Sequence, residues 1–458
     1  MIDRTLKQLI LFGATGDLAS LKLFPAIYEL YSQQQLNDNF QLIGFGRTEL
    51  SLDEFRRLFR KSVEDRFGAS AKNLDKLLNN IYYFSGQYDS VESYEKLGNY
   101  CLEIAAGSQS EIVAYCSVPP SIFGNIVESL AVTLKKSASL LKIVIEKPFG
   151  VDEKSAEDLF RIISRHFEEK DVYLLDHFLG KRPIQSILKL RMENNVINLM
   201  IKGQEIAGIK ITAWEKAGVD KRVGYYEQVG AMKDMIQSHL LQILTLITMD
   251  IPVNREIASL QREKNNILSA VRFSGKMDDV VFGQYSGYKS LPGVTEKAIT
   301  ETFARLKLSI DRRDWYNVPI IIETGKKMNE DKTVVDIEFK KTASQTDEVA
   351  HNRLVFEMKP AEKIELKLVQ QRNKKNPEDE NVFENILLEH GLMCQTDFCL
   401  GDYATLLNDI FRGEKIYFLS YAEIVASWKV IDSVDRLRVK ENIIPIYYEE
   451  GNDGKILN

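Results

Sequence analysis

The chain has 458 residues, of which 44% are apolar and 28% are charged, with 11 prolines and 26 glycines. This composition is typical of globular proteins and excludes collagenous, mucin-like and largely disordered classes. Sixty basic against 66 acidic residues give a formal charge of −6, so no basic bias indicates a nucleic-acid partner. The longest apolar stretch, residues 240–251, is too short to cross a bilayer, and the N-terminus lacks a signal-peptide pattern. We expect a soluble, cytoplasmic protein with no membrane partner.

The four cysteines are too few for a disulfide scaffold. Only Cys394 and Cys399 lie close together in the sequence, and they lack the spacing and the paired histidines of a zinc site. We therefore expect reduced cysteines and no metal site.

The first 175 or so residues alternate short apolar runs with helical patterns, as βαβ units do. The expected strands are 8–12, 41–45, 112–118, 141–145 and 172–175, and the expected helices are 17–32, 51–66, 122–136 and 154–169. The runs show little alternation, which is typical of parallel strands buried on both faces. This part predicts an α/β Rossmann domain with a doubly wound parallel sheet, over residues 1–178.

From about residue 205 the pattern changes to strands with a period of two. Val335, Ile337 and Phe339 alternate with polar residues, which predicts an antiparallel sheet with one buried face. The strand-like segments are 209–214, 267–273, 280–285, 302–310, 320–324, 335–339, 354–358 and 364–369, and 372–380 is expected to be a solvated loop. Residues 179–458 therefore predict an α+β domain with an antiparallel sheet.

A glycine-containing turn, Gly13-Ala14-Thr15-Gly16-Asp17-Leu18-Ala19, follows the first strand and opens a helix. Gly13 permits a tight turn, Gly16 lets the backbone approach a pyrophosphate, and the small Ala19 allows close packing of helix on strand. An ordinary βα turn is the alternative. The strand–turn–helix context favours dinucleotide binding.

Two basic residues follow other strands of this domain. Arg47 comes at the end of the second strand, where it would attract the 2′-phosphate of NADP, although a surface arginine is the alternative. Lys147, in Glu146-Lys147-Pro148-Phe149-Gly150, lies at the ligand-binding edge of the sheet and could reach a hydroxyl or a phosphate.

Two further clusters contain histidine. Asp176-His177-Phe178-Leu179-Gly180-Lys181 places an acid, an imidazole and an ammonium group at the end of the last strand. A helix over 231–249 carries His239 within its apolar stripe. A histidine on such a stripe is commonly a core residue, but burial would also favour the neutral imidazole that a general base needs.

Taken in order, these motifs, together with Asp234-Met235-Ile236-Gln237-Ser238-His239-Leu240-Leu241-Gln242 and Gly325-Lys326, resemble the glucose-6-phosphate dehydrogenase family over essentially the whole chain. The resemblance implies a Rossmann domain joined to a domain with a large antiparallel sheet. It implies oxidation of glucose 6-phosphate to 6-phospho-glucono-1,5-lactone with hydride transfer to NADP, a step of the oxidative pentose phosphate pathway. It also implies that residues 179–458 bind the substrate and form the contacts of a homodimer or a homotetramer.

The resemblance assigns roles by motif. His239 would be the general base for the C1 hydroxyl, and Asp176 would orient it. Substrate contacts are implied for His177, Lys181, Lys147, Glu215, Asp234, Lys326 and Lys332. The cofactor site is implied for Gly13, Ala14, Thr15, Gly16, Asp17, Leu18, Ala19, Arg47 and Lys147.

The chain departs from the family pattern at several positions. Phe178 replaces a tyrosine, Ser238 replaces an asparagine, and Asp331 stands in place of a basic residue, with Lys332 next to it. Two alternatives remain open: a related NAD(P)-dependent oxidoreductase that acts on another sugar or sugar phosphate, and a non-catalytic nucleotide-binding homologue.

Overall fold

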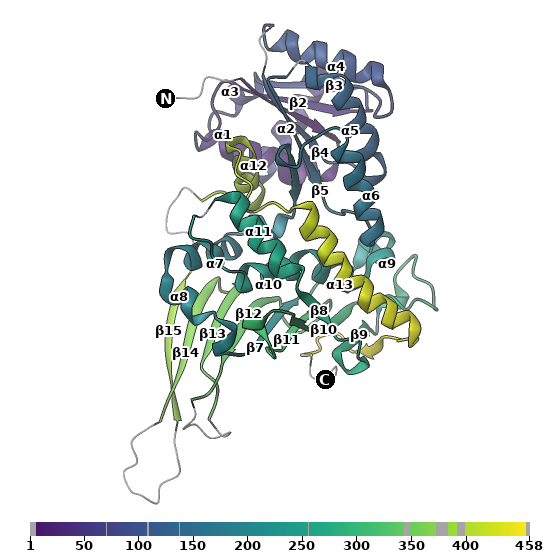
Figure 1. Ribbon diagram of the computed structural model, residues 1–458. Helices are drawn as coiled ribbons and strands as arrows, with labels where there is room; N and C mark the ends of the chain where they lie inside the picture. Colours follow the sequence, from purple (N-terminus) through teal and green to yellow (C-terminus); the bar gives the residue numbers. More distant parts are fainter. Residues whose placement is uncertain are drawn as a thin grey trace, which may run out of the picture. The chain divides into compact units, whose positions relative to one another are not determined.

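The computed structural model describes residues 6–69, 71–107, 110–136, 138–254, 256–342, 349–371, 383–391 and 399–454 (Figure 1). The chain forms two compact units. The first contains Met1–Gly150, Lys154–Lys181 and Thr396–Tyr421, and the second contains Val151–Glu153, Arg182–Gln395 and Ala422–Asn458. The division differs from the boundary predicted between residues 178 and 179, because Thr396–Tyr421 returns to the first unit.

A six-stranded parallel sheet forms the centre of the first unit. Its strands are β1 (Lys7–Phe12), β2 (Phe40–Gly46), β3 (Ile81–Ser85), β4 (Glu111–Cys116), β5 (Leu140–Glu146) and β6 (Val172–Leu175). Their order, β3-β2-β1-β4-β5-β6, is that of a Rossmann fold, which confirms the predicted fold class. The strand order reverses between β1 and β4, and ligands of such sheets bind beyond the carboxyl ends of these strands.

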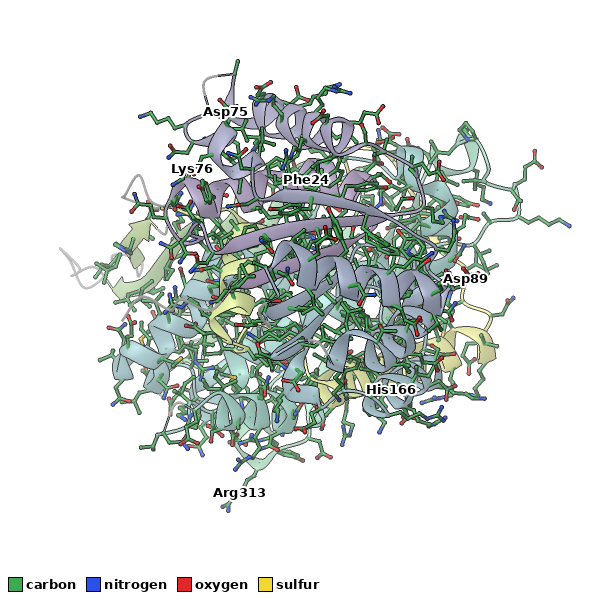
Figure 2. The ribbon with its side chains drawn as sticks, turned by 90° about the horizontal axis from the view of Figure 1, so that it is seen from above. Phe24, Asp75, Lys76, Asp89, His166 and Arg313 are labelled. Atoms are coloured by element: carbon green, nitrogen blue, oxygen red, sulfur yellow. The ribbon has the colours of Figure 1, made fainter. Side chains whose placement is uncertain are left out.

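Helices cover this sheet, and most of them occur where the sequence predicts them. They are α1 (Phe24–Ser32), α2 (Leu52–Phe67), α3 (Leu74–Leu78), α4 (Val91–Ile104), α5 (Phe123–Val132), α6 (Glu153–Ser164) and α12 (Asp402–Arg412). A capping box, in which Ser51 and Glu54 exchange hydrogen bonds, starts α2. Phe24, labelled in Figure 2, packs its ring 4.9 Å from that of Phe59, which joins α1 to α2 in the core.

A ten-stranded sheet forms the second unit. Its strands are β7 (Ile206–Trp214), β8 (Val271–Phe273), β9 (Val280–Tyr285), β10 (Phe303–Ile310), β11 (Ile320–Gly325), β12 (Lys332–Phe339), β13 (Arg353–Lys359), β14 (Lys363–Gln371), β15 (Phe383–Gly391) and β16 (Ile446–Tyr448). The strands run in the order β15-β14-β13-β12-β7-β11-β10-β9-β16, with β8 paired to β10. Most pairs are antiparallel as predicted, but β7–β11 and β9–β16 are parallel, so the sheet is mixed.

Figure 1 shows α10 and α11 over one face of this sheet. The helices of the unit are α7 (Arg182–Glu193), α8 (Asn195–Met200), α9 (Val223–Ala231), the π-helix η8 (Met232–Leu240), α10 (Leu241–Thr248), α11 (Ile257–Leu268) and α13 (Tyr421–Lys440). The helix predicted over 231–249 is therefore present, but its first half is a π-helix. The strand predicted over 267–273 is shorter, because Ile267 and Leu268 end α11.

Two further findings concern membrane-spanning helices and the cysteines. Within the described residues, no helix is both long and apolar enough to span a membrane. Cys101 and Cys116 are free and buried, whereas Cys399 is disulfide-bonded, so the expectation of reduced cysteines is wrong at that residue. The loop predicted over 372–380 lies outside the described residues.

Candidate active site

The glycine turn after β1 forms one wall of a cavity of about 550 Å³ in the first unit. Gly13 has a φ of +82°, and a Cβ there would lie 2.1 Å from the carbonyl oxygen of Ser117, which follows β4. Glycine is therefore required at the point where the ends of β1 and β4 approach most closely. The cavity lies at the reversal of strand order, where a dinucleotide is expected.

Some of the predicted cofactor residues line this cavity and others support it. Gly13, Thr15, Gly16 and Arg47 line it. Ala14 and Ala19 are buried beneath the turn, and Asp17 and Leu18 begin the segment that leads into α1. The sequence analysis missed the remaining lining residues, which follow β2, β3 and β4: Thr48, Gln87, Tyr88, Asp89, Ser117, Val118, Pro119, Ser121, Ile122 and Asn125.

Arg47 and Tyr88 form a polar corner of the cavity. The guanidinium carbon of Arg47 lies 5.9 Å from the centre of the Tyr88 ring, within the range of a cation–π contact. Burial raises the pKa of the Tyr88 hydroxyl, while a backbone hydrogen bond with Gly13 and the charge of Arg47 oppose this rise. Because Tyr88 follows β3, a strand that the sequence analysis did not predict, no local signal pointed to it.

The carboxyl ends of β5 and β6 lie side by side, with Glu146 opposite Leu175. Lys147 directly follows Glu146. The Glu146 carboxylate accepts a hydrogen bond of 2.5 Å from the Tyr115 hydroxyl of β4. Burial raises the pKa of Glu146 to about 7, while the Tyr115 hydrogen bond lowers it. The carboxyl group of Glu146, with its raised pKa, therefore lies next in the chain to Lys147 at the carboxyl end of β5.

A 3₁₀ turn over His177–Gly180 presents the predicted phosphate-binding residues. Asp176 is 1% exposed and starts the turn by accepting a 2.9 Å hydrogen bond from the backbone N–H of Phe178. The ammonium of Lys181 lies 3.5 Å from the centre of the Phe178 ring. The ring of His177 stacks on that of Tyr403, which α12 supplies from late in the sequence, at a centroid distance of 6.4 Å.

The π-helix η8 of the second unit carries Asp234 and His239. They are five residues apart, the separation closed by one i→i+5 turn. Both side chains are buried, His239 to 3% exposure. The hydroxyl of Tyr225 donates a 3.2 Å hydrogen bond to the Asp234 carboxylate. π-helical turns are frequent at functional sites, which fits the role predicted for this segment.

The second unit also brings Glu215 and Lys326 together. The Lys326 ammonium pairs directly with the Glu215 carboxylate, and the backbone N–H of Glu215 donates to the carbonyl of Gly325. β11, which ends at Gly325, packs against η8. The pair is thus held on the strand that supports the helix carrying His239.

Lys332 does not join this pair. Its side chain lies on the sheet face that bears Lys210, Thr212 and Trp214, in a cavity of about 420 Å³, with its ammonium 5.4 Å from the Trp214 ring centre. The neighbouring Asp331 accepts a hydrogen bond from the backbone N–H of Lys216. The contacts of Lys332 are thus with Trp214 and Glu330, and the substrate role implied for it stays a prediction.

Comparisons with known proteins agree with this architecture. Residues 10–186 match the family model of the glucose-6-phosphate dehydrogenase NAD binding domain, and residues 188–456 match that of the C-terminal domain. The chain is 30% identical to glucose-6-phosphate 1-dehydrogenase of Schizosaccharomyces pombe, over 97% of this chain and 91% of that protein. It is 32% identical to the cytoplasmic glucose-6-phosphate 1-dehydrogenase 5 of Arabidopsis thaliana, over 98% of this chain and 89% of that protein.

Solved structures give the same result. A glucose-6-phosphate dehydrogenase in complex with glucose 6-phosphate superposes with a TM-score of 0.88 at 29% identity, covering 99% of this chain and 96% of the other. The enzyme from Mycobacterium avium has a TM-score of 0.82 at 27% identity, covering 97% and 95%. A super-repressor mutant of Gal80p from Saccharomyces cerevisiae shares the fold alone, with a TM-score of 0.54 at 13% identity. The chain belongs to the glucose-6-phosphate dehydrogenase family.

Proposed function

We propose that His239 and Asp176 move the proton in the reaction of this family, the oxidation of glucose 6-phosphate to 6-phospho-glucono-1,5-lactone, in which NADP accepts the hydride. The burial of His239, 3% exposed on its π-helix, carries the proposal because it favours the neutral imidazole. Neutral imidazole can accept the proton of the C1 hydroxyl, and the deprotonated hydroxyl releases hydride from C1 more readily. The Asp176 carboxylate is proposed to orient the imidazole and to stabilise its protonated form.

An absorbance assay for NADPH tests the substrate. It compares glucose 6-phosphate, glucose and other hexose 6-phosphates at equal concentrations. We expect turnover with glucose 6-phosphate to exceed that with the others. Higher turnover with another sugar or sugar phosphate would favour the related oxidoreductase, and no turnover with any of them would favour the non-catalytic homologue.

The cavity of the first unit has the features that NADP requires. Gly13 leaves the space that a Cβ would fill, and the exposed Thr15 and Gly16 face a ligand at the start of a helical segment. We assign Arg47 to the 2′-phosphate, because a guanidinium forms short, charge-assisted hydrogen bonds with phosphate oxygens. Lys147, at the end of β5, is proposed to contact both cofactor and sugar.

For the sugar phosphate, we propose His177 and Lys181 as phosphate ligands and Glu215, Asp234 and Lys326 as contacts to sugar hydroxyls or phosphate. The position of Lys181 supports its share, since its ammonium lies over the Phe178 ring directly after the turn that carries His177. Lys332, whose side chain lines the cavity beside Trp214, is proposed as a further contact of this kind.

A homodimer or a homotetramer is proposed as the assembly. The edge strand β15 of the large sheet carries three consecutive exposed apolar side chains: Ile386 at 40%, Leu387 at 51% and Leu388 at 56% exposure. An apolar edge strand offers both unpaired backbone groups and apolar surface to a second copy.

The cytoplasm is the proposed compartment. The relatives include cytoplasmic forms, such as that of Arabidopsis thaliana, and also chloroplastic forms, such as that of Spinacia oleracea. Fractionation of the cells that produce the protein, with detection by a specific antibody, tests the assignment. Recovery in an organelle fraction would contradict it.

A further inference from the structure

We infer that Glu301 is a positioning residue: its buried carboxylate binds the N-terminus of the π-helix η8 and so positions His239, which this helix carries. The inference rests on the role proposed above for His239. Glu301 precedes β10, its side chain is 3% exposed, and the reaction as described makes no use of it. A carboxylate buried to this extent needs partners, and its partners lie at the start of η8.

Glu301 accepts hydrogen bonds from the backbone N–H groups of Ala231, the N-cap residue of this helix, and of Met232, its first residue. The backbone N–H of Ala231 donates to the Glu301 carbonyl over 2.9 Å, and that of Met232 donates to its carboxylate Oε1 over 3.2 Å. The first N–H groups of a helix have no partner within the helix, and a negative charge there is favoured by the helix dipole. One residue thus supplies two acceptors at the start of η8.

Gly230 shows how closely the carboxylate approaches. It breaks the helix between α9 and η8, with φ +61° and ψ −178°. A Cβ at this position would lie 2.2 Å from Oε1 of Glu301. Only glycine accepts both the backbone conformation and the contact.

Arg438 of α13 holds the other carboxylate oxygen. Its Nη1 donates a 2.6 Å hydrogen bond to Oε2 of Glu301, and its Nη2 donates to the carbonyl of Ile299. The next residue, Thr302, accepts a 2.9 Å hydrogen bond from the backbone N–H of Lys326. The dipeptide Glu301-Thr302 therefore fixes both the start of the His239 helix and the backbone of Lys326.

A matched pair of double variants tests the inference. Glu301→Gln with Arg438→Met keeps an oxygen acceptor for the Met232 N–H, whereas Glu301→Ala with Arg438→Met removes it, and both lack the ion pair. We expect kcat within about threefold of the wild type for the first. For the second we expect a loss of about ten- to a hundredfold, because small misplacements of reacting groups are costly. KM for NADP should stay unchanged in both, since its proposed residues lie in the first unit.

Two further variants guard against a general loss of stability. Glu323→Ala removes another buried carboxylate, which pairs with Arg305 on the same sheet, and should leave kcat within about threefold of wild type while lowering the melting temperature. Gly230→Ala should lower kcat as the loss of the acceptor does, and combining it with Glu301→Ala should cost less than the product of the single effects.

Equal kcat in the two double variants would overturn the inference, as would an equal loss of kcat in Glu323→Ala. The outcome is separable from that of the proposed function. If His239→Asn is inactive while Glu301→Ala keeps full turnover, only the positioning role fails. If His239→Asn keeps full turnover, the role of His239 itself is wrong.

Discussion

At the residue scale, the roles proposed for three side chains can each be tested by substitution, and His239 is the first. His239→Asn should lower kcat by roughly two to four orders of magnitude, because general-base catalysis contributes that much. The position is buried, so binding of glucose 6-phosphate, measured by calorimetry, and the circular dichroism spectrum should confirm that the variant folds. Near-normal turnover would remove His239 from the mechanism.

Arg47 should determine the coenzyme preference. It lines the dinucleotide cavity beside Tyr88 and is the arginine among the lining residues. Arg47→Ala should raise KM for NADP far more than KM for NAD, because only NADP presents the 2′-phosphate. Steady-state kinetics with both coenzymes measures the ratio. A proportional rise for both would show that Arg47 supports the cavity in another way.

Lys181 should carry a large share of phosphate binding. Phe178 supplies no hydroxyl, and the Lys181 ammonium lies over its ring. Charge-assisted hydrogen bonds contribute roughly 1.5–3 kcal/mol, so Lys181→Ala should weaken glucose 6-phosphate binding about ten- to a hundredfold. Activity on unphosphorylated glucose should hardly change.

A control variant in the same unit is Lys170→Ala. Lys170 is exposed and pairs with Glu168, away from the strand end that carries Lys181. It should leave both substrates unaffected. If Lys181→Ala reduces activity on glucose and glucose 6-phosphate in proportion, Lys181 contacts the sugar ring or supports the fold.

At the scale of elements, the ends of β4 and β5 share a buried acid. Burial raises the pKa of Glu146 from its ordinary value of 4.5 to about 7, and Tyr115 donates to it. Between these values the folded protein binds more protons than the unfolded chain. The free energy of unfolding should therefore fall as the pH rises from about 4.5 to 7 through this group.

Glu146→Gln removes this titration. We expect the free energy of unfolding of the variant, from urea denaturation at pH 5 and at pH 8, to fall less between the two pH values than that of the wild type. The same pH dependence in both proteins would show that Glu146 is solvated in the folded state.

The elements also differ in how far local sequence predicts them. β1 and β4 are continuous apolar runs, and both occur where they are predicted. β3 was not predicted, although its five residues are as many as in the strand predicted over 8–12 and its burial alternates. The segment Met232–Leu240 has the apolar spacing of an α-helix, yet it forms a π-helix. Its i→i+5 bonds follow the break at Gly230, whose backbone lies against the carboxylate of Glu301, a residue about seventy positions away.

At the scale of the whole molecule, the assembly can be tested through β15. Leu388→Lys places a charge on the exposed apolar edge, where a second copy is proposed to bind. The variant should shift toward the monomer in sedimentation equilibrium at micromolar concentration, with its circular dichroism spectrum unchanged. An unchanged mass would place the interface elsewhere, and a monomeric wild type would contradict the assembly itself.

Local sequence determined the fold class, the dinucleotide turn and the motif residues of the site. These depend on neighbours in the chain: the apolar runs of parallel strands, the glycine at a tight turn, and the histidine on an apolar helical stripe. Gly13 and Arg47 line the cavity that these patterns predict.

Only the tertiary structure decided which distant residues complete these local features. α12 returns to the first unit and stacks Tyr403 on His177, although nothing in its amphipathic pattern specifies that partner. Lys326 and Lys332 are close in sequence but have different partners, since the Lys326 ammonium pairs with Glu215 whereas that of Lys332 lies over the Trp214 ring. Burial, pairing and the choice of face depend on contacts between segments far apart in the chain, and a local pattern contains no information about them.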